Sequence, residues 1–190
     1  SGRDRKTLGG WINNENISKV AEHGAWIKEE SNDWKTLEPL GHDWKPEIRQ
    51  ILELYVDRTP GSLVEEKDFS LVWHYRKADV GLGEIRSREL LQTLQYFTQN
   101  LNLQVLEGSK VIEVKNSGIN KGQAALHFYA QQQWDFILAA GDDWTDEDTF
   151  KVLPEDAFAI KVGLVRSVAK YNVKSYTEIR ELLTELAGKE

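Results

Sequence analysis

The stretch 134–150, which reads WDFILAAGDDWTDEDTF, carries the strongest indication of the fold. Its apolar residues up to Ala140 are typical of a short strand buried on both faces of a parallel sheet. Gly141 ends this run, and the next seven residues include five carboxylates: Asp142, Asp143, Asp146, Glu147 and Asp148. Like charges at this density repel one another, so we expect cationic partners at the end of the strand.

The composition narrows the class of protein. The 190 residues are 40% hydrophobic with a formal net charge of −7, which is typical of a soluble globular protein of one or two domains. The chain has no basic stripe, so neither nucleic acid nor an anionic membrane is an expected partner. No apolar run approaches the ~20 residues of a spanning helix and no leader opens the chain, so we expect a cytoplasmic protein. Because there are no cysteines, oxygen or histidine would bind a metal, and oxygen ligands favour magnesium or calcium.

The middle of the chain predicts a separate α+β unit. Apolar residues recur at helical spacing over 44–55 and again over 83–100. Two strand-like segments follow each helix, SLVEEK and FSLVWHYRK after the first, LQVLEG and KVIEVK after the second. This repeated order indicates a four-stranded sheet with both helices on one face and the opposite face free. Trp73 and Tyr75 are expected in its core.

The flanking segments predict a parallel sheet. Helical and strand-like stretches alternate there, with helices over 122–133 and 177–187 and strands over 134–140 and 158–162. Near the N-terminal end a loop enters a helix, and a strand then ends at Glu22–Gly24, which can belong to the same sheet. The sequence therefore predicts an α/β, Rossmann-like core of residues 1–42 and 118–190, with an inserted α+β cap over residues 43–117.

Polar residues gather where these strands end, in the segments Ser1-Gly2-Arg3, Asn120-Lys121-Gly122 and 141–146. A hydroxyl, an ammonium and paired carboxylates suit a phosphate and a divalent cation, because the cation neutralises the acids while the other groups bind phosphate oxygens. A plainer interpretation is that Thr145 caps a helix, with the later acids in its positive first turn, and that Lys121 is simply solvated. It leaves Asp142 and Asp143 unexplained, because an uncompensated charge at the tip of a buried strand is costly.

Several motifs together resemble a known family: SGRD, EHGAW, DRTPGSLVEEK, WHYRKAD, EVKNSGINKG and GDDWTDEDTF, in this order. The chain is similar to the trehalose-6-phosphate phosphatase family of haloacid-dehalogenase-like (HAD) phosphatases, including the phosphatase part of fused trehalose synthase–phosphatase proteins. The similarity extends over nearly all of the chain. It implies a magnesium-dependent phosphomonoesterase with a HAD core and a four-stranded cap, which attacks phosphate through the aspartate of a DxDGT motif.

The resemblance also implies roles for residues at the strand ends. Ser1 is implied as the phosphate-binding hydroxyl, and Lys121 as the lysine that steadies the phosphate and the nucleophile. Asp142 is implied as a magnesium ligand, and Asp143 and Asp146 as carboxylates that bind or support the metal. We therefore predict Ser1, Lys121, Asp142 and Asp146 as catalytic residues and Asp142 and Asp143 as metal ligands.

Substrate selectivity is expected from the inserted cap. The alternation in KVIEVK places Glu113 on the opposite side of the strand from Ile112 and Val114. If the apolar side packs on the helices, Glu113 faces the α/β core domain across a cleft. A carboxylate there can accept hydrogen bonds from sugar hydroxyls, and the alternative is an exposed strand residue paired with a nearby lysine. The resemblance implies that several residues contact the sugar phosphate or lie near it: Arg58, Lys110, Glu113, Arg3, Glu22 and His23.

No DxDGT motif occurs in these residues, whereas in the family it lies upstream of SGR. We expect the sequence to be part of a longer chain and inactive as it stands, since the nucleophile is missing; the alternative is a protein that has lost catalysis. The predicted function is hydrolysis of trehalose 6-phosphate to trehalose and phosphate, in trehalose biosynthesis. Two other hypotheses are another sugar-phosphate phosphatase of the superfamily and a non-catalytic module that binds sugar phosphate or a partner synthase domain.

Overall fold

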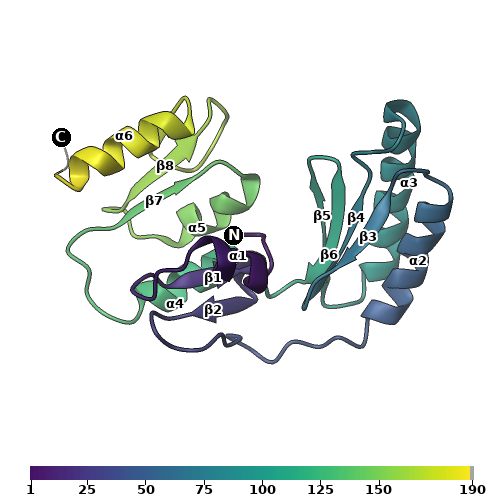
Figure 1. Ribbon diagram of the computed structural model, residues 1–190, viewed down its shortest axis with the longest axis horizontal. Coiled ribbons are helices and arrows are strands. Elements are labelled where there is room, and N and C mark those ends of the chain that lie inside the picture. Colours follow the sequence, from purple (N-terminus) through teal and green to yellow (C-terminus); the bar gives the residue numbers. More distant parts are fainter. Residues whose placement is uncertain (189–190) are drawn as a thin grey trace. The chain divides into compact units, whose positions relative to one another are not determined.

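The structure is a computed structural model that describes residues 1–188 (Figure 1). The chain divides into two compact units, Ser1–Ile119 and a second that begins at Asn120. This division differs from the predicted one in keeping residues 1–42 with the middle segment. The grouping of 1–42 with 118–190 as a single core stays a prediction.

The first unit opens with a short helix and a small sheet. Helix α1 (Arg5–Trp11) is capped by Asp4, whose carboxylate accepts hydrogen bonds from the Lys6 and Thr7 N–H groups. Strand β1 (Lys19–Ala21), the 3₁₀ turn η1 (Glu22–Gly24) and strand β2 (Trp26–Lys28) follow, and β1 pairs with β2 in antiparallel fashion. The sequence allowed the strand before Glu22–Gly24 to belong to the parallel sheet, but among the described residues β1 pairs with β2 alone. The reversal at η1 sends the chain back along β1, so β1 pairs locally instead.

The rest of the first unit is the predicted αββαββ segment. Its elements are α2 (Lys45–Asp57), β3 (Leu63–Glu66), β4 (Ser70–His74), α3 (Val80–Thr98), β5 (Leu103–Gly108) and β6 (Val111–Asn116). The strands form an antiparallel four-stranded sheet in the order β3-β4-β6-β5. Figure 1 shows α2 and α3 on the same side of this sheet, which confirms the predicted arrangement.

The core of this segment lies between the sheet and its two helices. Alternate residues of β4 and β6 face the helices and pack on apolar residues of α2 and α3: Ile48, Leu52, Leu71, Trp73, Leu90, Leu94, Ile112 and Val114. Trp73 and Tyr75 are buried and their rings stack with centroids 4.8 Å apart, so their prediction as core residues is confirmed. Glu113 lies between Ile112 and Val114 on β6 and therefore belongs to the opposite face.

The second unit is built on parallel strands. Its elements are α4 (Lys121–Tyr129), β7 (Leu138–Gly141), η2 (Trp144–Asp146), α5 (Glu147–Val152), β8 (Phe158–Val162), β9 (Tyr171–Val173) and α6 (Tyr176–Leu186). The strand order is β7-β8-β9, and both pairings are parallel, as the alternation of helix and strand predicts. The sequence patterns did not predict the short strand β9, and α5 corresponds to the helix of the plainer interpretation, with Glu147 and Asp148 in its first turn.

The decisive stretch 134–150 differs in one respect from its prediction. The strand begins only at Leu138, and Trp134 and Phe136 are 44% and 54% exposed, so this segment is not buried on both faces. Within the described residues β7 pairs with β8 alone and is an edge strand, which leaves its other side without a covering strand. Gly141 does end the strand as expected, immediately before the acidic loop.

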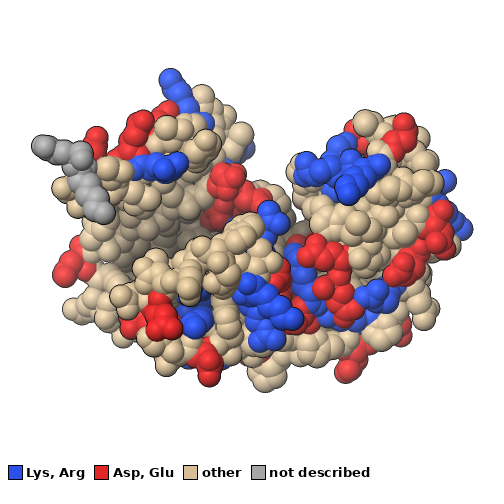
Figure 2. Space-filling model, in the orientation of Figure 1, with Lys and Arg blue, Asp and Glu red and all other residues tan. Residues whose placement is uncertain are grey.

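No helix among residues 1–188 is long and apolar enough to cross a lipid bilayer. On the face shown in Figure 2, Lys and Arg lie in small groups, interspersed with Asp, Glu and uncharged residues.

Candidate functional site

The N-terminal loop of the first unit is held against η1 by its main chain. The Ser1 carbonyl oxygen accepts a hydrogen bond from the His23 N–H at 2.9 Å, and the Arg3 carbonyl oxygen accepts one from the Glu22 N–H at 2.9 Å. The Ser1 hydroxyl oxygen accepts the Arg3 N–H at 3.2 Å. The structure thus brings together four of the predicted residues, Ser1, Arg3, Glu22 and His23.

Two of these residues have an uncommon backbone conformation. Glu22 and His23 have φ angles of 47° and 57°, in the left-handed region that side chains other than glycine rarely adopt. The close packing also requires a glycine at position 2, because a Cβ there would lie 2.6 Å from His23 Nε2. Backbone strain of this kind costs on the order of 1–3 kcal/mol per residue and is typical of functional sites.

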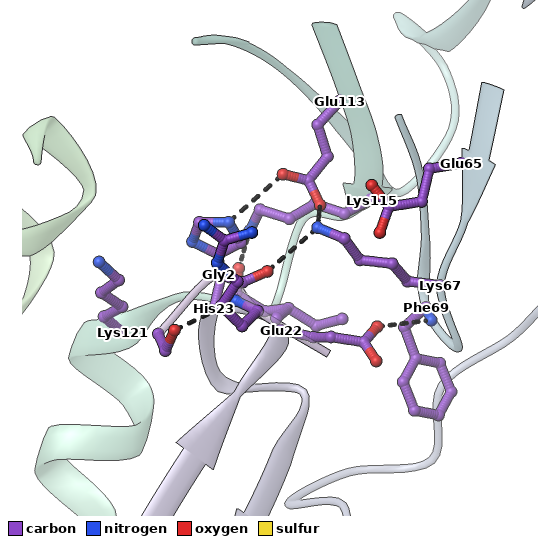
Figure 3. A network of polar contacts seen from close by, with 12 residues as sticks. Gly2, Glu22, His23, Glu65, Lys67, Phe69, Glu113, Lys115 and Lys121 are labelled. Carbon is purple, nitrogen blue, oxygen red and sulfur yellow. Dashed lines mark hydrogen bonds and ion pairs between the residues drawn. The ribbon is translucent and has the colours of Figure 1, made fainter. Parts of the chain in front are cut away.

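Glu113 is the centre of a buried polar cluster in the first unit (Figure 3). Its Oε2 lies 3.3 Å from His23 Nε2 and its Oε1 lies 3.4 Å from Lys67 Nζ. The Lys67 ammonium also donates to the Gly2 carbonyl oxygen at 3.0 Å. We call Gly2, His23, Lys67 and Glu113 the Glu113 cluster. It ties the N-terminal loop to the face of the four-stranded sheet that lies away from α2 and α3.

The charges around Glu113 keep it ionised. It is only 8% exposed, and burial alone would raise its pKa. The hydrogen bond from His23 and the charges of Lys67 and His23 outweigh burial, and they lower the pKa to about 2. The alternative of a solvent-exposed strand residue is therefore excluded. The side chain is a buried, oriented hydrogen-bond acceptor.

Glu22 has the opposite electrostatic setting. Its Oε2 accepts the Phe69 N–H at 3.0 Å, while its buried Oε1 has no hydrogen-bond partner among the described residues. Burial raises the pKa of this carboxyl group, although the hydrogen bond from Phe69 opposes the shift. Glu22 thus connects η1 to the β3–β4 turn, which also carries Lys67.

Lys67 was not identified from the sequence. It lies in the turn between β3 and β4, where a lysine next to two glutamates and an aspartate is usually solvated. Only the register of the sheet shows that this turn lies beside the end of β6 that carries Glu113 and Lys115, since Ser70 pairs with Lys115. No sequence signal other than its place inside the DRTPGSLVEEK motif singles it out.

The structure does not bring Arg58 and Lys110 into the Glu113 cluster. Lys110 lies in the β5–β6 turn, and its ammonium contacts Glu84 of α3 at 3.1 Å and lies 5.6 Å from the centroid of the Tyr75 ring. Those partners belong to the helix-covered side of the sheet. Arg58 is the exposed C-cap of α2 and forms no ion pair within residues 1–188. Their predicted contact with substrate stays a prediction.

In the second unit, Lys121 and Asp146 form a mostly buried ion pair. Asn120 caps α4 by accepting the Gln123 N–H, which fixes Lys121 as the first residue of the helix. Lys121 Nζ lies 2.7 Å from Asp146 Oδ1, and Asp146 Oδ2 accepts the Asp143 N–H at 2.9 Å. A Cβ at Gly141 would lie 2.3 Å from the Asp146 carboxylate carbon, so this position needs glycine.

The Asp142 and Asp143 side chains are exposed and form no ion pair within the described part of the chain. The free-energy cost expected for burying these two charges therefore does not arise, because their main-chain carbonyl groups rather than their carboxylates point into the unit. The buried Lys161 of β8, which sequence reasoning missed, donates to the Asp142 and Asp143 carbonyl oxygens at 3.0 and 2.7 Å. Thr145 does not cap a helix; it is buried within η2, and its hydroxyl has no partner among residues 1–188.

These residues fit a magnesium site of the kind completed by water and substrate. Within residues 1–188 no three His, Asp or Glu side chains cluster closely enough to hold a metal ion by themselves. Mg²⁺, however, usually keeps several waters and takes only one or two protein carboxylates together with substrate phosphate. Asp142 and Asp143 provide two exposed carboxylates of that type next to each other.

Comparisons with known proteins identify the family of this chain. The family model described as trehalose-phosphatase matches residues 1–181. The chain belongs to the trehalose-phosphatase family. A bifunctional trehalose-6-phosphate synthase/phosphatase of Thermoproteus tenax is 38% identical over 186 residues, covering 98% of this chain and 25% of the relative. The chain thus spans about a quarter of the length of this curated relative.

Solved structures place the fold within the same family. The C-terminal domain of a C. albicans trehalose-6-phosphate phosphatase is 30% identical with a TM-score of 0.89, covering all of this chain and 77% of that one. A haloacid dehalogenase-like hydrolase from Bacteroides thetaiotaomicron, 13% identical with a TM-score of 0.68 over 96% of this chain and 84% of that one, supports the fold alone. The predicted HAD-like α/β fold with an α+β cap is confirmed for this trehalose-phosphatase family member.

Proposed function

We propose that this protein hydrolyses trehalose 6-phosphate to trehalose and inorganic phosphate, as a phosphoric monoester hydrolase of trehalose biosynthesis. The observation that carries the proposal is the acidic loop after β7, with exposed Asp142 and Asp143 beside the Lys121–Asp146 pair, in a chain that matches the trehalose-phosphatase model over residues 1–181. Paired carboxylates next to a lysine are suited to a phosphate and its divalent cation.

The residues of the second unit are assigned to the phosphate and the metal. We assign Asp142 and Asp143 as ligands of Mg²⁺, which when bound would neutralise charge on the transferred phosphoryl group. Lys121 would bind a phosphate oxygen, and Asp146 holds the Lys121 ammonium in place at 2.7 Å. The hydroxyl of Ser1, in the first unit, is assigned to another phosphate oxygen.

The residues of the first unit are assigned to the sugar. The Glu113 carboxylate is ionised, buried and oriented by His23 and Lys67, so it can accept hydrogen bonds from sugar hydroxyls with little reorganisation. Four further residues are assigned as sugar-phosphate contacts on family resemblance: Arg3, Glu22, Arg58 and Lys110. A trehalose-6-phosphate synthase domain in the same chain or complex is the proposed partner, since the relative from Thermoproteus tenax is named as a bifunctional synthase/phosphatase.

The proposed reaction needs a nucleophile that these 190 residues do not include as a DxDGT motif. The test compares the chain with a version extended upstream through that motif, and it measures phosphate release from trehalose 6-phosphate with Mg²⁺. We expect release only from the longer version. Equal release from both would show that the nucleophile lies within residues 1–190. If neither version releases phosphate but trehalose 6-phosphate binds, the result would instead support the non-catalytic module.

A further inference from the structure

Lys161 is a charged residue in an apolar setting that the proposed reaction does not use. It lies on β8, the middle strand of the three-stranded sheet, beside the buried Ala159 and Ile160, and it is itself only 2% exposed. In the parallel register it pairs with Gly141, the last residue of β7. A buried ammonium group is costly unless its hydrogen bonds are satisfied, so its partners indicate what it does.

Two of those partners are the main-chain carbonyl oxygens of consecutive residues in the acidic loop. Lys161 Nζ donates to the Asp142 oxygen at 3.0 Å and to the Asp143 oxygen at 2.7 Å. Both carbonyl groups therefore turn toward the inside of the unit, and both side chains are left exposed. A single atom thus holds the backbone of the two candidate metal ligands from behind.

The third partner is Glu147, at 3.7 Å from the same ammonium. The Glu147 carboxylate also accepts hydrogen bonds from the Ser167 hydroxyl at 2.7 Å and the Val168 N–H at 2.9 Å. Burial alone would raise the pKa of Glu147, but these hydrogen bonds and the charge of Lys161 lower it below its usual value. Lys161 and Glu147 therefore connect the loop after β7 to the loop after β8.

We propose that Lys161 is a positioning residue that orients the Asp142 and Asp143 carboxylates for a divalent cation through its hydrogen bonds to their carbonyl oxygens. This inference rests on the metal site of the proposed function. Lys161 would not contact the cation itself. Its effect would be transmitted through the backbone at the carboxyl end of β7, as outer partners do in other metal sites.

The charge of Lys161 alone would have the opposite effect. A positive charge near a cation site repels the cation, so removing it would tighten binding if Lys161 acted only as a charge. Losing the hydrogen bonds frees the backbone of the two ligands and should weaken binding. The sign of the change in metal affinity therefore separates the two roles.

The experiment measures Mn²⁺ binding by electron paramagnetic resonance, with the chain of residues 1–190 and no substrate. We expect Lys161→Met to weaken Mn²⁺ binding by about ten- to a hundredfold, the range typical of lost outer partners in metal sites. Lys151→Met is the matched control, because Lys151 is an exposed lysine of the same unit with no ion pair within residues 1–188. It should bind Mn²⁺ as the wild type does.

Lys161→Arg is a second test variant in case Lys161→Met does not fold. It keeps the charge but places a larger group in a site with little space, so we expect Mn²⁺ binding at least about threefold weaker. Unchanged or tighter binding in a folded Lys161→Met or Lys161→Arg variant would overturn the proposal, as would a lower Tm with unchanged affinity. If the wild type itself does not bind Mn²⁺, or if Asp142→Ala binds it equally well, the metal site of the proposed function is at fault instead.

Discussion

The Glu113 cluster and the acidic loop neutralise their carboxylates in different ways. In the first, Glu113 is buried, and its two oxygens face His23 Nε2 and the Lys67 ammonium. In the second, Asp142 and Asp143 are exposed, and the nearby Lys161 binds their carbonyl oxygens instead of their carboxylates. The first site is electrostatically complete, whereas the second leaves two negative charges available.

This difference indicates what each site can recognise. A carboxylate that is already ion-paired and held in one orientation gains little from a further cation, but it can still accept directed hydrogen bonds from hydroxyl groups. Exposed carboxylates on a backbone that is held in place lose little conformational entropy when they bind a hydrated cation such as Mg²⁺. The difference is what the proposed function would require, with the buried carboxylate suited to sugar hydroxyls and the exposed pair suited to a metal ion.

The largest effect is expected from removing a carboxylate of the exposed pair. In the protein extended through its DxDGT motif, Asp142→Ala should lower Mg²⁺-dependent phosphate release at least about a thousandfold, equivalent to about 4 kcal/mol, because a metal ligand is lost. Asp156→Ala, at an exposed position of the same unit, should have activity like the wild type. Retained turnover of Asp142→Ala at saturating Mg²⁺ would remove Asp142 from the metal site.

A smaller and more selective effect is expected at Glu113. Glu113→Ala in the same extended protein should lower kcat/KM for trehalose 6-phosphate by about ten- to a hundredfold, since hydrogen bonds to the sugar are lost. Turnover of p-nitrophenyl phosphate, which has no sugar, should change by less than about threefold. Glu107→Ala on β5, an exposed glutamate of the same sheet, is the control. Equal losses on both substrates would mean that Glu113 acts on the phosphate or on the fold.

The buried Glu113 should also make the stability of the protein depend on pH. The folded pKa of Glu113 is about 2 against an ordinary 4.5, so its ionised form stabilises the fold above pH 4.5 and loses this effect as pH falls toward 2. Glu113→Gln should therefore lower the unfolding free energy by about 2–3 kcal/mol at pH 7, and by progressively less below pH 4.5. Urea unfolding at pH 7, 4 and 3 measures this gap. A gap that stays constant would show that the Glu113 charge is not what stabilises the cluster.

The smallest effect on stability is expected at Lys110, outside both sites. Its ion pair with Glu84 is at the surface, so Lys110→Gln should change the unfolding free energy by less than about 1 kcal/mol. If Lys110 contacts the sugar phosphate as proposed, the same variant should still raise KM for trehalose 6-phosphate. Lys77→Gln, an exposed lysine of the same unit, should change neither quantity. An unchanged KM in Lys110→Gln would remove Lys110 from the proposed sugar-phosphate contacts.

The sequence was most informative where a local pattern decides the outcome. The αββαββ order and the position of Glu113 on the face away from the helices follow from a period of two in the strands and a helical period in α2 and α3, and both agree with the structure. That face is not free as expected, because Ser70, Val72, Glu113 and Lys115 on it are buried. Turn and loop signals located the acidic loop after Gly141 correctly. The same reasoning overestimated the burial of Trp134 and Phe136, because an apolar run does not show how many strands cover it.

The sequence by itself determined the family, the αββαββ order of the middle segment and the two carboxylate-bearing segments, because these depend on motifs and on short-range periodicity. Only the tertiary structure decided which lysine contacts which carboxylate-bearing segment. Lys67 is 46 residues from Glu113, and Lys161 is 20 residues from Gly141, where the strand before Asp142 ends. Only the pairing of strands brings each lysine to its partner. Like the pairing of β1 with β2, these contacts depend on strand register and burial, which one-dimensional patterns do not specify.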